Sequence, residues 1–153
     1  MDLSMLKHEL ASDPANLGYA GQSPMRKAEL VNAVLTSAPA ARLVSERGIM
    51  ECYAGGAVAA DALLQKIEAF SQTAHPAAGA VRRALKFLAQ PEGIDIGAAS
   101  TRSMIDMLAG GGVISAAEAA HLKAIGERPV SRREVLGLGW VEPAHVLAAE
   151  ALP

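Results

Sequence analysis

Two pairs of arginines are the most concentrated charged groups in this sequence. Arg132-Arg133 follows Ser131 at the start of a short predicted helix. Because the helix dipole disfavours positive charge at a helix N-terminus, this pair indicates either a solvated surface or a partner carboxylate or phosphate. We favour the solvated surface. The second pair, Arg82-Arg83, lies off the apolar line of another predicted helix and is interpreted as an exposed face.

Trp140 is the only tryptophan, and it lies in a turn between Gly139 and Val141. It either anchors the C-terminal helix in the core or belongs to an interface, where tryptophan is among the residues that contribute most to binding. We favour the core position and keep Trp140 as a candidate interface residue.

Other residue types with chemical potential are dispersed. Glu118 and His121 form one E-x-x-H unit, but a helical di-metal site needs a second copy. Gly110-Gly111-Gly112 lacks the strand and the lysine of a phosphate loop, and is interpreted as a helix stop. No Gly-x-Ser-x-Gly nucleophile motif occurs. The four histidines stand at no metal-ligand spacing: His8, His75, His121 and His145. The sequence therefore predicts no catalytic residue, no metal, no cofactor and no enzymatic activity.

The single cysteine and the charge balance limit the setting of the protein. Cys52 has no partner for an intramolecular disulfide, and we expect it to be a small buried apolar residue. The 14 Lys+Arg against 16 Asp+Glu give no global basic field, so nucleic acid is not the expected partner. The longest uncharged runs are too short for a membrane span.

Composition decides the fold class. The chain of 153 residues contains 32 alanines, while aromatic residues make up only 3%. Alanine is the strongest helix former, whereas strand-rich folds use aromatic and β-branched residues. The sequence therefore predicts an all-α or mostly α protein.

Apolar periodicity and stop signals predict a compact bundle of about seven or eight short helices in a single domain over residues 1–153. Serine capping boxes begin two of them, at Ser115–Glu118 and Ser131–Glu134. Minor extended pieces are expected within residues 40–54 and 93–97. In the first segment, Ser45-Glu46-Arg47-Gly48 indicates either a short hairpin or a helical turn, and we favour extended pieces. The predicted helices begin near residues 2, 24, 57, 76, 101, 115, 132 and 142, and three of them are bounded at 57–70, 101–109 and 132–136.

The first helix, within residues 1–12, has an apolar line of Leu3, Leu6 and Leu10. Ser12-Asp13-Pro14 and a glycine-containing loop separate it from the following helix. It can therefore dock on its own core or on a neighbouring copy, and we slightly favour the neighbour.

Two segments resemble a family of small proteins encoded by the structural, virion-morphogenesis modules of tailed bacteriophages and prophages. LKHELASDPANLGYAG at residues 6–21 is similar to the start of that family, and SRREVLGLGWVEPAHV at residues 131–146 is similar to its end. Residues 105–115 fit loosely. Val135 departs from the pattern, because family members more often carry Glu there.

The resemblance implies a non-enzymatic structural or assembly protein, acting as a virion subunit at the head–tail junction or tail. Its partners would be other phage structural proteins and copies of itself in a ring or symmetric layer, assembled in the host cytoplasm. Alternatives are a small helical DNA-binding regulator with Arg132-Arg133 on its recognition helix, or an assembly chaperone or adaptor absent from the mature particle. The candidate interface residues are Leu3, Leu6, Leu10, Tyr19, Arg132, Arg133 and Trp140.

Overall fold

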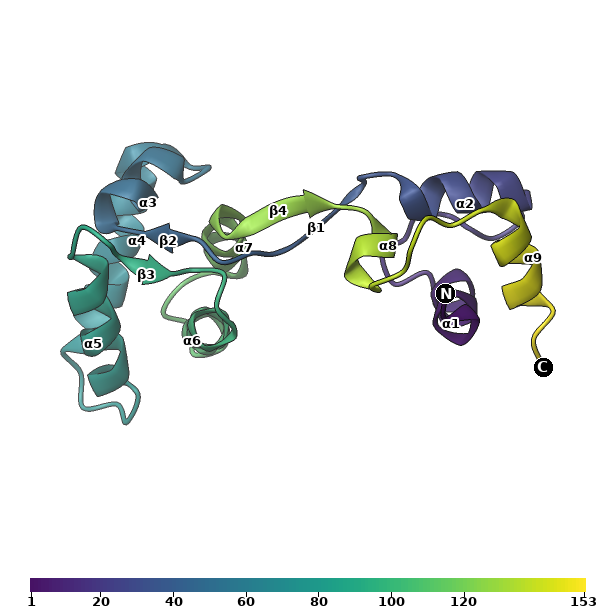
Figure 1. The fold of residues 1–153 in the computed structure, drawn as a ribbon. Helices are drawn as coiled ribbons and strands as arrows, with labels where there is room; N and C mark the ends of the chain where they lie inside the picture. The colour runs from purple at the N-terminus through teal and green to yellow at the C-terminus, as the bar shows by residue number, and fades with distance from the viewer. The chain divides into compact units, whose positions relative to one another are not determined.

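The computed structural model describes all 153 residues and confirms the mostly α class (Figure 1). Nine helices are joined by loops and four short strands. The elements are α1 (Leu3–Ser12), α2 (Pro24–Asn32), β1 (Thr36–Pro39), β2 (Leu43–Val44), α3 (Glu46–Cys52), α4 (Gly56–Ser71), α5 (Ala78–Leu88), β3 (Ile94–Asp95), α6 (Ala99–Gly110), α7 (Ala116–Ile125), β4 (Glu127–Val130), α8 (Arg132–Val135) and α9 (Pro143–Glu150).

The chain divides into two compact units, where the sequence had led us to expect a single domain. Unit 1 consists of Met1–Ala38 and Arg128–Pro153, and unit 2 of Pro39–Glu127. Each unit has its own cluster of buried apolar side chains. Both crossings between the units fall within β1 and β4, which pair with each other in a two-stranded sheet.

Unit 1 is built from both ends of the chain. Helices α1 and α2 both pack on α9. Leu6, Val31 and Val146 are fully buried at the centre of this unit. In this structure the N-terminal helix therefore packs on its own chain, which is the alternative that we had favoured less.

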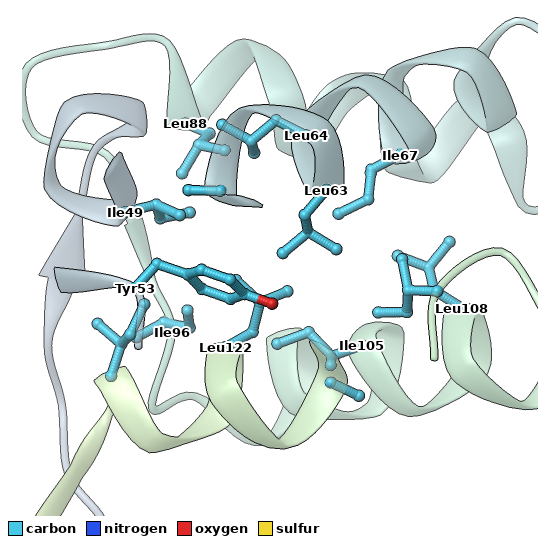
Figure 2. Packing of buried hydrophobic residues seen from close by; sticks show 14 of the residues in the cluster. Ile49, Tyr53, Leu63, Leu64, Ile67, Leu88, Ile96, Ile105, Leu108 and Leu122 are labelled. Carbon is cyan, nitrogen blue, oxygen red and sulfur yellow. The ribbon is translucent and has the colours of Figure 1, made fainter. Parts of the chain in front are cut away.

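Unit 2 encloses the larger core, part of which Figure 2 shows. Leu63 and Ile67 of α4, Leu108 of α6 and Leu122 of α7 all belong to this cluster. A small antiparallel pair, β2 with β3, aligns Val44 with Ile94 at the edge of the core.

Helix starts were predicted well. Ser115 accepts a hydrogen bond from the Glu118 amide while the Glu118 carboxylate accepts one from the Ser115 amide. Ser131 and Glu134 repeat the arrangement at α8, so both predicted capping boxes are confirmed. These boxes are predictable because the serine and the glutamate of each lie only three positions apart, in the first turn of one helix.

The segment 40–54 was predicted only in part. Strand β2 is one of the expected extended pieces. Glu46–Cys52, however, forms a helix, α3, in addition to the eight that were predicted. Ser45 caps this helix by accepting from the Gly48 amide, and Ile49 anchors it in the core. Gly48 lets the helix lie close to Val44: an added Cβ would stand 3.0 Å from a Val44 methyl carbon.

The expectation of a buried Cys52 is wrong. Its side chain is exposed, 3.5 Å from the Arg42 guanidinium. Tyr53, one residue further, takes the buried position and meets the ring of His121 edge-on.

The capping box of α7 generates a pH prediction. The Lys66 ammonium, 2.6 Å from Glu118, and the Ser115 amide lower the pKa of the Glu118 carboxyl to about 2 from its ordinary 4.5. A lowered pKa stabilises the folded state above the unfolded pKa, and this contribution is lost as the pH falls from about 4.5 to about 2. We expect Glu118→Gln to flatten the fall of melting temperature in this window, measured by circular dichroism.

Glu92→Gln is the matched control, because it removes the same charge from an exposed side chain without a hydrogen-bond or ion-pair partner. Identical acid profiles for the two variants would contradict the assignment of this pH dependence to Glu118.

Candidate functional site

All seven candidate interface residues lie in unit 1, but the structure assigns them different positions. Leu6 and Tyr19 are fully buried, and Leu3 and Leu10 are partly buried against the same cluster. Most of this set therefore forms the core of unit 1. The exposed member is Trp140, and its neighbour Arg133 is partly buried.

Arg132 is not a solvated surface residue. Its guanidinium donates two hydrogen bonds to the carboxylate of Glu9, at 2.7 and 2.6 Å. The side chain of Glu9 is only 2% exposed and that of Arg132 14%. Of the two explanations for a cation at this helix N-terminus, we favoured a solvated surface. The structure instead shows a partner carboxylate. Hydrogen bonding to Glu9 raises the pKa of Arg132 further.

Tyr19 completes this buried group. Its hydroxyl donates to Glu9 Oε1 at 3.3 Å. Burial of the phenol and the neighbouring Glu9 charge raise the pKa of Tyr19, so it remains a hydrogen-bond donor at ordinary pH. Three residues thus share their polar atoms inside the apolar core of unit 1.

The loop that delivers Tyr19 is fixed by Asp13. The carboxylate of Asp13 accepts hydrogen bonds from the amides of Leu17 and Gly18, each at 2.7 Å. Burial of the carboxylate opposes its charge, but these amide bonds outweigh burial and lower the pKa of Asp13. Asp13 itself has a φ of 41°, in the left-handed region that Asp tolerates better than most residues. The Asp-Pro segment is therefore a structural turn.

Trp140 is exposed, so the core position that we favoured is wrong. Its exposed fraction is 63%. The guanidinium carbon of Arg133 lies 5.3 Å from the centroid of the Trp140 ring, within cation–π range. Arg133 Nε is buried without a hydrogen-bond partner.

A shallow groove adjoins Trp140 on unit 1. One side of the groove is formed by α2 and the residue that follows it, and the other side by the start of α9 and the residues before it. The lining residues besides Trp140 are Met25, Ala28, Glu29, Asn32, Ala33, Val141 and Pro143. Met25 is 63% exposed, as is Trp140. We call Met25, Arg133, Trp140 and this groove the Trp140 surface. Two hydrogen bonds between the Asn32 side chain and the Val141 backbone, at 2.7 and 3.1 Å, hold its two sides together.

Sequence reasoning missed Glu9 and Met25. The signal for Glu9 was present: it stands three residues after Leu6 and one before Leu10, on the apolar side of the first helix. A carboxylate in that place predicts a buried cation as partner. Met25 carried no such signal, because it directly follows the proline that begins α2.

The remaining candidates have local structural roles. His145 Nδ1 accepts from the Glu142 amide at the start of α9, and His75 Nδ1 accepts from the Ala77 amide. Gly112 has a φ of 71° in the turn after α6, as a helix stop requires. No group of three or more His, Cys, Asp or Glu side chains is placed to hold a metal ion.

No family model, curated protein or solved structure matches this chain. The resemblance of residues 6–21 and 131–146 to tailed-phage proteins therefore stays a prediction. The helices are each too short or too polar to cross a membrane.

The buried ion pair generates a stability prediction. Glu9→Gln leaves the Arg132 guanidinium buried without its counter-charge, and breaking a buried pair in this way costs about 3–5 kcal/mol. We expect a corresponding loss in the free energy of unfolding of unit 1 in urea. Circular dichroism follows the transition, and the fluorescence of Trp140, the only tryptophan, adds a probe that lies in this unit.

Glu29→Gln is the matched control. Its partner Arg26 is 2.9 Å away, but both side chains are 56% exposed, so the loss should stay within about 1 kcal/mol. Replacing both Glu9 and Arg132 by Met should restore much of the stability lost in Glu9→Gln. Equal losses in the two Gln variants would show that burial of the Glu9 pair has no energetic weight.

Proposed function

We propose that this chain is a non-enzymatic tailed-phage structural or assembly protein, a virion subunit at the head–tail junction or tail that acts through protein–protein contacts. The observation that carries the proposal is the Trp140 surface, together with the resemblance of the two terminal segments. The segment 131–146 contains both Arg133 and Trp140, so the resemblance and the surface coincide in the chain.

The Trp140 surface has the composition of a contact site. Tryptophan and arginine are the residues most enriched at positions that dominate binding energy, and methionine is enriched at interfaces in general. Here the three types lie on one unit, with Trp140 and Met25 both lining the same groove. Exposed apolar side chains gathered around a groove favour association, because covering them removes apolar area from water.

The surface is also held rigid, which reduces the entropy lost on binding. The capping box of Ser131 and Glu134 fixes the turn that carries Arg133. The guanidinium of Arg133 lies over one face of the Trp140 ring. On the other side Asn32 clamps the backbone of Val141.

The occupant that this proposal names is another subunit of the particle, either the next copy in a ring or a neighbouring structural protein. In a ring, one surface of each copy meets a different surface on the next, so the Trp140 surface need not be self-complementary. The DNA-binding alternative gains nothing from the structure, because the Arg132 guanidinium is bound to Glu9 and α8 has only four residues.

The test is made in the bacterium and phage that encode the chain. Mass spectrometry of purified particles should detect the protein, and Trp140→Ala should lower its copy number per particle several-fold. Leu147→Ala is the matched control, because Leu147 is 57% exposed on the same unit but does not line the groove.

Circular dichroism of both purified variants should show unchanged helix content. Absence of the protein from purified particles would overturn the virion assignment and favour an assembly chaperone. Equal incorporation of Trp140→Ala and wild type would overturn the role of the Trp140 surface.

A further inference from the structure

Unit 2 contains an apolar cavity that its core does not fill. The cavity measures about 70 Å³ and lies among side chains of α3 to α7 and β3. Of its fourteen lining residues, Thr101 alone has a polar side chain. Leu64, Leu88 and Ile105, which Figure 2 shows in the surrounding cluster, belong to its walls. Close-packed interiors have few such voids, so an unfilled one is a candidate binding site.

The cavity adjoins a hollow on the surface between α5 and the beginning of α6. The hollow measures about 220 Å³. Ala84, Ile94, Thr101 and Met104 line both spaces and so form the wall that they share. Met104 is partly buried, and methionine is the apolar side chain that changes its conformation most readily. Met104 therefore lies where a change in its side-chain conformation would alter the passage between the hollow and the cavity.

The residues at the rim of the hollow include hydrogen-bond donors and one positively charged side chain, and none of them is acidic. Arg83 lines it, is exposed and has no carboxylate partner, whereas its neighbour Arg82 donates to the Ser71 carbonyl at 2.6 Å. Ser100 contributes a hydroxyl, and Phe87, 55% exposed, contributes an apolar edge. None of the residues that line the hollow is Asp or Glu.

We infer that the hollow and the cavity together bind a small aliphatic carboxylate. The carboxylate lies at the rim, where the Arg83 guanidinium can donate to both of its oxygens. The alkyl chain passes Met104 into the cavity. Because the cavity is about half the size of one that holds benzene, it admits an unbranched chain rather than a ring. This inference concerns unit 2 and is independent of the Trp140 surface.

The test is to titrate the full chain with butanoate, hexanoate and octanoate and to monitor the chemical shifts of its backbone amides by NMR. Shifts should concentrate at residues 80–87 and 99–104. Affinity should rise by roughly fourfold for each methylene that becomes buried and stop rising once the chain fills the cavity. The neutral probe hexan-1-ol tests the alkyl site without the charge.

Arg83→Gln should weaken hexanoate by roughly two- to fivefold and leave hexan-1-ol unchanged. Lys86→Gln is the matched control, since Lys86 is an exposed cation on the same helix that does not line the hollow. Ala84→Leu, which fills the shared wall, should weaken both probes. The inference is overturned if octanoate shifts no amides in these two ranges, or if Arg83→Gln and Lys86→Gln weaken hexanoate equally.

Discussion

The joint burial of Glu9 and Arg132 is the constraint on which the packing of unit 1 depends. These residues are 123 positions apart, yet their side chains meet through two short hydrogen bonds inside an apolar cluster. A buried carboxylate or guanidinium alone would be strongly unfavourable, so neither can remain in place without the other. The pair therefore requires α1 and α8 to come together in the same folded unit.

This requirement explains the organisation of the chain. Unit 1 closes only when its first segment meets its last, so the intervening residues, Pro39–Glu127, form a unit with a separate core. Further contacts tie the same two segments: Lys7 Nζ donates to the Leu152 carbonyl at 2.7 Å, and Asn32 bonds to Val141. Because the polar atoms of Glu9 are shared between Arg132 and Tyr19, the group is satisfied internally. The Trp140 surface is a part of unit 1 that remains exposed and can contact a partner.

The parts predicted from sequence were those set by near neighbours in the chain. The serine caps of α7 and α8 follow from residues three positions apart, and the fold class follows from alanine content. The division into two units could not be predicted in this way, because apolar periodicity shows that a helix has a buried face but not which face it meets.

The errors at individual residues, in both units, have the same origin. Trp140 and Cys52 were placed by residue type, but their exposure is decided by Val141 and Tyr53, which take the buried positions beside them. Arg132 was judged by its place at a helix start, whereas its partner lies at the other end of the sequence. A helical turn at α3 was the less favoured alternative, because a single buried isoleucine, Ile49, gives this helix little apolar periodicity.

Native-state hydrogen exchange of Arg132→Met against the wild type tests the central role of the ion pair most directly. Amide protection reports the free energy of opening segment by segment, so it can separate the two units. The account predicts that amides of α1, α2 and α9 lose protection together in the variant, while those of α4, α6 and α7 keep theirs. Loss confined to α8, or an equal loss in both units, would contradict it.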